Sequence, residues 1–291
     1  MTIHSTCEID LSAQIAPDAV IGPGCVIGPN AVIERGVVLG PHVVIGPNTT
    51  LRENVKASAG VVIGTEPQDL KYEGSQTACE IGPRTVLREY CTIHRGTKAR
   101  GATVIGSDCF LMAQTHVAHD CLLGNNVTMA SYTGLGGHCE VGDRAVLGGF
   151  VAIHQFVKVG KLAMVAGFTG LRKDAPPFMI TYGHPPARVY GLNSIGLRRS
   201  GMDTETRGLL KSAFRILFRS GLNFADAVRE VRSGLPDAPE IRYLLEFIET
   251  SKRGVCSGAS GNYDEIVEAE FKDSIAQTIK MSTAMPRDIS E

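Results

Sequence analysis

The residues best suited to proton transfer are four histidines and an aspartate. His116, His119 and Asp120 lie together in the stretch THVAHDC, and His138 and His154 follow downstream. A neutral imidazole beside a carboxylate can accept a proton at about pH 7, and the carboxylate orients the ring and stabilises the imidazolium that forms. The cluster therefore indicates general-base chemistry. The sequence has no G-x-S-x-G nucleophile elbow that would suggest a serine nucleophile.

A six-residue repeat must position these side chains. From Val20 the sequence reads VIGPGC, VIGPNA, VIERGV, VLGPHV. Every sixth position from Ile15 to Leu171 gives 27 sites, and 23 of them carry Ile, Leu, Val or Met; the others are Ala57, Asp69, Ser75 and Ala99. A helix would need spacings of three and four, and an ordinary strand a period of two. The repeat therefore predicts a parallel β-helix over about residues 15–171.

The period also predicts which residues stack. Hexapeptide β-helices have three faces per coil, so residues 18 apart should lie above one another at about 4.8 Å. By this spacing Asp120 and His138 share a column on consecutive coils, and His119 lies one position away. The same spacing stacks Cys91 on Cys109, and Cys121 on Cys139.

The cysteines fit the turns of the repeat. Seven of the eight fall four residues after a site of the six-residue count, six of them after an aliphatic residue and Cys79 after Ser75. They are Cys7, Cys25, Cys79, Cys91, Cys109, Cys121 and Cys139, and Cys256 lies outside the repeat. No C-x-x-C pair is present, and the cytosolic location that the absence of a signal peptide predicts disfavours disulfides. We therefore expect small buried side chains at the turns rather than disulfides or a zinc site.

Sequence character divides the chain into three parts. A β-helical part is expected over residues 1–186, with loop insertions at about 65–80 and 94–104, where Gly, Pro and charged residues interrupt the strand pattern. A helical domain is expected over 187–255, with helices from about Asp203 to Gly221, from Phe224 to Val231 and from Pro239 to Ile248. Residues 256–291 are expected to form a partly flexible extension, a link followed by a short helix.

Basic residues recur every four positions in the first of these helices. They are Arg207, Lys211, Arg215 and Arg219, and they follow closely after Arg198 and Arg199. Such a stripe is either the solvated side of an amphipathic helix or a surface that docks an acidic partner.

Composition narrows the class of partner. The chain has 29 Lys and Arg against 30 Asp and Glu, a formal net charge of −1, so no general positive field would attract nucleic acid or an anionic membrane. No signal peptide and no apolar run of about 20 residues is present. We expect a soluble cytoplasmic protein without stable membrane insertion.

Five motifs resemble one known family. They are QDLKY (68–72), TIHRGT (92–97), HVAHD (116–120), HQF (154–156) and GLRRSG (196–201). In order and spacing they resemble the UDP-N-acetylglucosamine O-acyltransferases that open lipid A synthesis, over roughly residues 1–255. The family ends near SKRGV, whereas this chain continues to Glu291, and no function is assigned to that continuation.

The resemblance implies a homotrimer of left-handed β-helices with active sites between neighbouring subunits. The implied reaction moves an (R)-3-hydroxyacyl chain from acyl carrier protein to the 3-hydroxyl of UDP-N-acetylglucosamine, without cofactor or metal. Acyl carrier protein is small and acidic, so the basic stripe would have a natural partner.

The resemblance also implies a role for particular residues. His119 would be the general base, Asp120 would orient it, and the Gly137 N–H would stabilise the oxyanion. Asp69 would contact the sugar, with Lys71, His116 and His138 beside it. At the nucleotide-sugar end would lie His154, Gln155, Asn193 and Arg199, the last suited to the diphosphate. Gly167 matches the position that limits acyl length, which favours a long chain near C14.

Three other functions remain open at the level of sequence. One is an N-acyltransferase acting on a 3-amino UDP-sugar, which Asp69 disfavours. Another is a zinc-dependent carbonic anhydrase of the β-helix type, in which His116, His119 and His138 would hold the metal. The last is a β-helical scaffold, which would bind no UDP-sugar.

Overall fold

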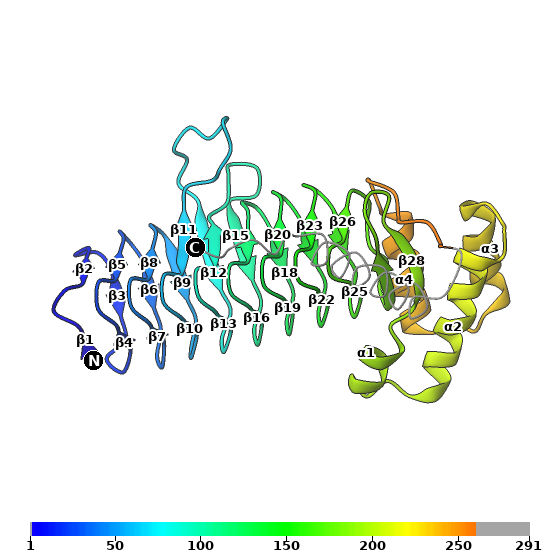
Figure 1. Cartoon of the computed structure of the whole chain (residues 1–291), viewed down its shortest axis with the longest axis horizontal. Helices are drawn as coiled ribbons and strands as arrows, with labels where there is room; N and C mark the ends of the chain where they lie inside the picture. The colour runs from blue at the N-terminus through cyan, green and yellow to red at the C-terminus, as the bar shows by residue number, and fades with distance from the viewer. Residues whose placement is uncertain (1, 260–291) are drawn as a thin grey trace, which may run out of the picture.

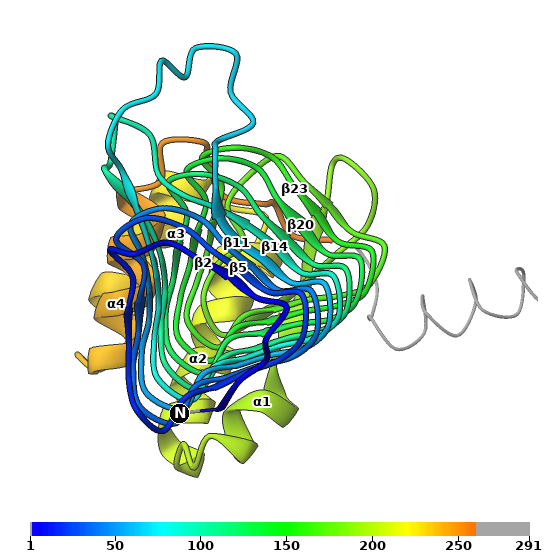
Figure 2. The same ribbon diagram turned by 90° about the vertical axis from the view of Figure 1, so that its left-hand side faces the viewer.

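The computed structural model describes residues 2–259, which form a parallel β-helix capped by helices (Figure 1). Each regular coil has three short strands joined by tight corners. Seen from the N-terminal end, the coils wind in the left-handed sense that the resemblance implied (Figure 2). The coils begin at Thr2, within the β-helical part predicted for residues 1–186 and ahead of the repeat counted from Ile15, because Ile3 and Ile9 already continue the repeat.

Within residues 2–259 the strands form three sheets. The first sheet contains β1 (Thr2–Ile3), β4 (Val20–Ile21), β7 (Val38–Leu39), β10 (Lys56–Ala57), β13 (Val86–Leu87), β16 (Phe110–Leu111), β19 (Thr128–Met129), β22 (Val146–Leu147), β25 (Met164–Val165), β27 (Met179–Tyr182) and β28 (Arg188–Leu192). The second sheet contains β2 (Glu8–Ile9), β5 (Val26–Ile27), β8 (Val44–Ile45), β11 (Val62–Thr65), β14 (Thr92–His94), β17 (His116–Val117), β20 (Gly134–Leu135), β23 (Ala152–Ile153) and β26 (Gly170–Leu171). The third sheet contains β3 (Gln14–Ile15), β6 (Val32–Ile33), β9 (Thr49–Leu51), β12 (Ala78–Ile81), β15 (Ala102–Ile105), β18 (Leu122–Leu123), β21 (Glu140–Val141) and β24 (Lys158–Val159).

The aliphatic repeat forms the core of the coil. Ile45, Ile63 and Ile93 are at most 1% exposed, and each such side chain contributes about 1.5–3 kcal/mol through burial. The corners require a left-handed backbone, and Asp120 (φ 60°) and His138 (φ 62°) both occupy such positions. Two candidate site residues therefore sit in a conformation that few non-glycine residues adopt.

Two insertions lengthen the 18-residue spacing. Ile105 pairs with Leu123 at the regular interval, but Leu51 pairs with Ile81 and Ile81 pairs with Ile105. The insertions therefore add 12 and 6 residues, whole multiples of the repeat. This is why the count continues across them, and why three exceptions, Asp69, Ser75 and Ala99, fall in the loops rather than in strands.

The second insertion makes one predicted stacking wrong. Cys91 lies beside Thr115, 24 residues away, with 3.1 Å between Sγ and Oγ1, whereas Cys109 lies beside Thr85. Cys91 and Cys109 therefore occupy different corners. All eight cysteines are free, and seven are buried, as expected for small side chains at turns.

The insertions form two loops at the same corner, between the second and third sheets. The first loop (66–77) joins β11 to β12, and the second loop (95–101) joins β14 to β15. Both project from one side of the coil (Figures 1 and 2). The second loop contacts the next coil through Thr97, which donates to Asp120.

The helical part follows an antiparallel pairing of β27 with β28. Its helices are α1 (Ser194–Arg199), α2 (Thr204–Arg219), α3 (Phe224–Gly234) and α4 (Pro239–Glu249). The three predicted helices are present, and α1 was not predicted. Asp203 caps α2 by accepting from the N–H of Thr206 at 2.8 Å.

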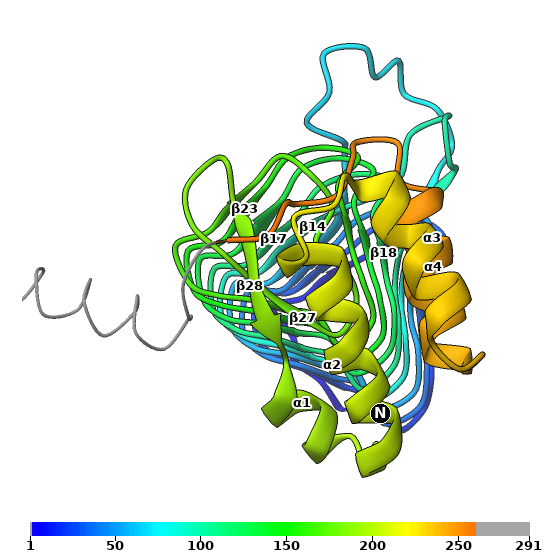
Figure 3. The same cartoon turned by 90° about the vertical axis from the view of Figure 1, so that its right-hand side faces the viewer.

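In Figure 3, α2 lies beside β28 at the end of the coil. No helix within residues 2–259 is both long and apolar enough to cross a membrane. The predicted extension starts at Cys256; its residues 256–259 run beside Val189 of β28, and its residues 260–291 lie outside the described part of the chain.

Candidate active site

His119 and Asp120 form a buried hydrogen-bonded pair at the corner beneath the loops. His119 Nδ1 lies 2.8 Å from Asp120 Oδ2, and the Asp120 side chain is 0% exposed. Thr97 donates to both oxygens of the same carboxylate, from its N–H at 2.9 Å and its hydroxyl at 2.6 Å. Burial alone would raise the pKa of Asp120, but the hydrogen bonds from Thr97 and His119 hold it below its ordinary value.

The ionised carboxylate determines which imidazole nitrogen can act as base. An ionised carboxylate only accepts hydrogen bonds, so Nδ1 of His119 must carry the proton and donate to Asp120. Nε2 is then the acceptor nitrogen. This is the tautomer that a general base requires.

His138 stacks one coil above Asp120, as the 18-residue spacing predicted. Its Nε2 lies 3.6 Å from Asp120 Oδ2, and its ring meets that of His119 edge-on at 5.1 Å. Phe156 of the next coil stacks on the other side at 4.5 Å. Burial lowers the pKa of His138, while the negative charges of Asp120 and Asp69 act in the opposite direction.

Gly137 lies directly against the His119 ring. A Cβ at Gly137 would stand 2.6 Å from Cε1 and 2.7 Å from Nε2 of that ring, so any other residue would displace the imidazole. Within residues 2–259 no hydrogen-bond acceptor is found for the Gly137 N–H. A backbone donor is therefore available beside the nitrogen that would act as base.

The first loop and the second sheet contribute the remaining nearby residues. Asp69 Oδ1 accepts from the N–H of Lys71 at 3.0 Å, which shapes the loop around them. His116 lies in β17, where its Nδ1 is 2.8 Å from Thr92 Oγ1. Burial lowers the pKa of His116. Its neighbour on the next coil is Gly134, where an added Cβ would meet nothing within 4 Å.

Other predicted residues lie elsewhere in a single chain. His154 and Gln155 are exposed at the same corner, two coils beyond Ala118 and His119. Gly167 lies at a different corner, where a Cβ would come within 3.2 Å of the Gly149 carbonyl oxygen. One chain therefore does not place the acyl-length position beside the base.

Asn193 and Arg199 stand at the two ends of α1, which lies far from the loops in Figure 3. Asn193 is buried and holds the protein itself together, donating to the Leu162 carbonyl at 2.9 Å and capping α1 through the Gly196 N–H. A direct contact between this amide and a ligand would have to share those bonds. The exposed Arg199 has no such restriction.

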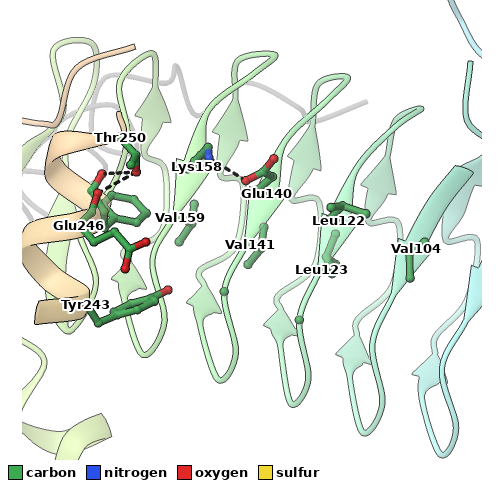
Figure 4. A pocket seen from close by; sticks show the side chains of 13 residues that line it. Val104, Leu122, Leu123, Glu140, Val141, Lys158, Val159, Tyr243, Glu246 and Thr250 are labelled. Atoms are coloured by element: carbon green, nitrogen blue, oxygen red, sulfur yellow. Dashed lines mark hydrogen bonds and ion pairs between the residues drawn. The ribbon is translucent and has the colours of Figure 1, made fainter. Parts of the chain in front are cut away.

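Hollows within residues 2–259 lie outside the histidine cluster. One is a groove of about 700 Å³ lined by apolar residues of the first sheet, including β28. Three basic residues also line it, namely Arg199, Lys211 and Arg215. A second hollow, of about 470 Å³, lies between α4 and the third sheet, and Lys158 pairs with Glu140 there at 3.0 Å (Figure 4). Neither hollow is lined by an imidazole.

Sequence reasoning missed three residues that shape the site. Thr97 holds Asp120, Phe156 stacks on His138, and Arg95 is buried beneath the first loop. All three lie in the motifs TIHRGT and HQF, which were recognised without assigning them roles. Their contacts cross 18 to 31 residues of chain, so only the coil geometry reveals them.

The chain is similar to proteins of one known family over most of its length. A family model described as UDP N-acetylglucosamine O-acyltransferase, domain 2, matches residues 174–256, and a bacterial transferase hexapeptide model matches residues 1–35, 18–53 and 102–137. The chain is 48% identical over 255 residues to an acyl-(acyl-carrier-protein)–UDP-N-acetylglucosamine O-acyltransferase of Thermodesulfovibrio yellowstonii, covering 87% of this chain and 98% of that protein. It is 61% identical over 197 residues to the protein of the same name from Aquifex aeolicus, covering 67% and 75%.

A solved structure shows the same likeness in three dimensions. The crystal structure of UDP-N-acetylglucosamine O-acyltransferase from Moraxella catarrhalis superposes with a TM-score of 0.84 at 41% identity. The match covers 88% of this chain and 99% of that one. Both the coil and the helical cap are therefore shared.

Proposed function

Because the chain belongs to the UDP-N-acetylglucosamine O-acyltransferase family, we propose that His119 is the base of its acyl transfer. The protein is an acyltransferase that moves an acyl chain from acyl carrier protein to an oxygen of UDP-N-acetylglucosamine, the first step of lipid A synthesis. The family does not favour the N-acyltransferase alternative. The observation that carries the proposal is the His119 ring, fixed by a buried carboxylate and lying against Gly137.

The proposed reaction proceeds by direct transfer. His119 Nε2 takes the proton of the sugar 3-hydroxyl as that oxygen attacks the thioester carbonyl carbon. The carbonyl oxygen becomes an oxyanion and accepts from the Gly137 N–H, a contact whose loss typically costs about 3 kcal/mol of barrier. The C–S bond then breaks, and the imidazolium returns its proton to the departing sulfur of the carrier.

Substrate contacts are proposed from the surrounding residues. Asp69 binds the sugar, with Lys71, His116 and His138 beside it, and Asp120 keeps the His119 ring in place. His138 is supported in this role by its Nε2 atom 3.6 Å from Asp120 Oδ2 and by its stacking on Phe156. The donor chain is proposed to be an (R)-3-hydroxyacyl group.

A homotrimer is proposed because the site is incomplete in one chain. Gly167 follows β25 at another corner of the coil, and Arg199 ends α1, which lies far from the loops in Figure 3. A neighbouring subunit can bring its own Arg199 and Asn193 to the loops of the first, with His154 and Gln155 completing the nucleotide-sugar end. The active site would then lie in a cleft between two copies.

A cytoplasmic location is also proposed. The eight cysteines are all free, which is typical of a reducing compartment. Acyl carrier protein as the donor agrees with this location.

Product analysis tests the function directly. The purified protein is incubated with mixed hydroxyacyl carrier proteins, UDP-N-acetylglucosamine and its 3-amino analogue, and the product is identified by mass spectrometry. We expect an ester on the hydroxyl sugar. An amide on the amino sugar as the main product would overturn the proposed acceptor, and absence of UDP-sugar binding by calorimetry would indicate a scaffold.

A metal-dependent alternative is tested separately. Within residues 2–259 the ligand atoms of His119, Asp120 and His138 all lie within 4.8 Å of one another, which is compact enough for a cation. His116, which the zinc hypothesis required, is not part of that set. We expect dialysis against a strong chelator to leave turnover unchanged. Loss of activity that stoichiometric zinc restores would instead support a metal enzyme.

A further inference from the structure

We infer that residues 94–97, which we call the joint, set the first loop against the His119–Asp120 pair. In this arrangement Arg95 is a positioning residue for the loop that carries Asp69, and Thr97 is a positioning residue for the pair. The inference rests on the proposed role of Asp69 in sugar binding. It adds two residues that act through others rather than by touching the substrate.

The Arg95 side chain holds the first loop by its guanidinium group. That side chain is 10% exposed. Its Nε and Nη2 donate to the Tyr72 hydroxyl at 3.1 and 2.9 Å, and Nη1 donates to the Gly64 carbonyl at 3.2 Å. Nη2 also lies 3.3 Å from a carboxylate oxygen of Glu66. One planar group therefore ties together the start and the middle of the loop.

The loop is tied further by Tyr72 itself. While its hydroxyl accepts from Arg95, it donates to the Ser75 carbonyl at 2.8 Å. The Arg95 guanidinium also lies over the Tyr72 ring, 5.5 Å from its centroid. Asp69 lies between Glu66 and Tyr72, so contacts on both sides of it depend on Arg95.

The backbone of the joint fastens both ends of the loop. The Arg95 N–H donates to the Thr65 carbonyl before the loop, and the Gly96 N–H donates to the Ala78 carbonyl after it, both at 3.0 Å. Gly96 has no room for a side chain, because a Cβ there would lie 2.4 Å from the Ala102 nitrogen. The His94 ring also bonds the Glu66 carbonyl.

The other end of the joint holds the catalytic pair. Thr97 follows Arg95 by two residues and donates twice to the Asp120 carboxylate. Four consecutive residues therefore touch both the sugar-binding loop and the group that orients the base. Since displacement of a reacting group by about 1 Å can cost on the order of 100-fold in rate, such a link would fix the sugar hydroxyl relative to His119.

The first test separates substrate binding from chemistry. We expect Arg95→Gln to raise KM for UDP-N-acetylglucosamine by on the order of 10-fold, with a smaller change in kcat. Arg95→Lys should resemble Arg95→Gln, because a lysine keeps the charge but loses the planar fork. The control is Arg84→Gln, which removes a two-bond pair with Asp108 far from the loop and should leave KM unchanged.

A double substitution tests whether Arg95 acts through Asp69. If it does, Arg95→Gln should have little further effect on KM once Asp69→Ala is present. Fully multiplicative effects of the two substitutions would overturn the inference. Equal effects of Arg95→Gln and Arg84→Gln would also overturn it, since they would indicate a general loss of stability.

The order of the loop can be measured without turnover. The chain has no tryptophan, and Leu70 is fully exposed beside Asp69, so Leu70→Trp places a single reporter on the loop. We expect Arg95→Gln, and the milder Tyr72→Phe, to lower its fluorescence anisotropy and increase its quenching by acrylamide. An unchanged reporter in both variants would overturn the inference. A responding reporter in a protein that does not acylate UDP-N-acetylglucosamine would overturn the proposed function alone.

Thr97 is tested by an isosteric change and its rescue. Thr97→Val removes the hydroxyl that bonds Asp120 and should lower kcat about 10-fold or more, with little change in KM. Thr97→Ser restores the hydroxyl and should recover most of the activity. Equal activity of the valine and serine variants would overturn the role of Thr97.

Discussion

At the scale of residues, the chemistry depends on one imidazole, that of His119, whose tautomer is fixed by the hydrogen bond between its Nδ1 and Asp120. The His119 ring is 2.8 Å from a carboxylate that two bonds from Thr97 hold ionised, and Gly137 leaves space for the ring. Each contact is short-range, so each can be changed singly. Predictions at this scale therefore concern reaction rate and protonation.

Loss of the base should reduce turnover without affecting assembly. We expect His119→Ala to lower kcat by about 100-fold or more, since general-base catalysis contributes roughly 10²–10⁴-fold. Steady-state kinetics measures kcat, and the mass of the protein in solution shows its oligomeric state. Near-normal turnover would remove His119 as the base. His119→Gln is the milder control, in case His119→Ala changes the oligomeric state.

Buried histidines should make stability depend on mildly acidic pH. Burial lowers the pKa values of His94 and His116 below 6.5, so the unfolded chain binds more protons than the folded one as the pH falls through this range. The protein therefore keeps its full free energy of unfolding above about pH 6.5, and this free energy decreases as the pH falls below that value. We expect urea unfolding to show this decline between pH 7.5 and 5.5, and His94→Gln to reduce its slope. An identical slope in the variant would contradict the assignment.

At the scale of elements, the coil tolerates little change in backbone spacing. Many glycines follow the buried aliphatic residue because the neighbouring coil leaves no room for a side chain. A Cβ at Gly106 would stand 2.4 Å from the Gly124 carbonyl oxygen. The glycine of the repeat is thus needed because neighbouring coils stack too closely for a side chain, as well as because it favours a turn.

A methyl group at this position should loosen the stack. We expect Gly106→Ala to destabilise the protein by about 1–3 kcal/mol, the usual cost of overpacking. The loss of stability is measured by thermal unfolding, as a lower melting temperature of the variant. Glu34→Ala is the matched control, because the same position of an earlier coil already carries a side chain. A wild-type melting temperature for Gly106→Ala would show that the coils separate at little cost.

Acyl length should respond to the corner that carries Gly167. Gly167→Met would project a side chain from this corner, so we expect preference to shift towards shorter donors. Competition among carrier proteins of different acyl length measures the shift. Gly208→Met, at an exposed helical position with no neighbour within 4 Å, should leave the profile unchanged. An unaltered profile for both would remove Gly167 as the limiting position.

At the scale of the whole molecule, basic side chains recur along one helix, α2, at the end of the coil. The basic stripe of α2 is only partly available. Arg219 donates to the Tyr190 carbonyl, and Arg207 bonds Thr204 and the Asp203 carbonyl. Lys211 and Arg215, by contrast, line the large groove beside Arg199.

Reversal of these two charges should weaken carrier docking. We expect Lys211→Glu with Arg215→Glu to raise the Kd for acyl carrier protein more at low salt than at high salt, because salt screens surface charge. Binding at two ionic strengths measures this. Arg229→Glu with Arg242→Glu makes the same charge change on α3 and α4 and should have little effect. An equal rise in Kd at both ionic strengths would indicate that the basic stripe is only the solvated face of an amphipathic helix.

The sequence by itself determined the coil. Each coil buries one aliphatic side chain every six residues, so the pattern is local and can be read directly from the sequence. It also determined the stacking of Asp120 with His138, since no insertion separates them. Tertiary structure decided the rest. The loops shift the spacing from 18 to 24 and 30 residues, so the contacts of Thr97 with Asp120 and of Arg95 with Tyr72 follow no repeat. Such contacts depend on which coil lies beside which, and a local pattern does not contain that information.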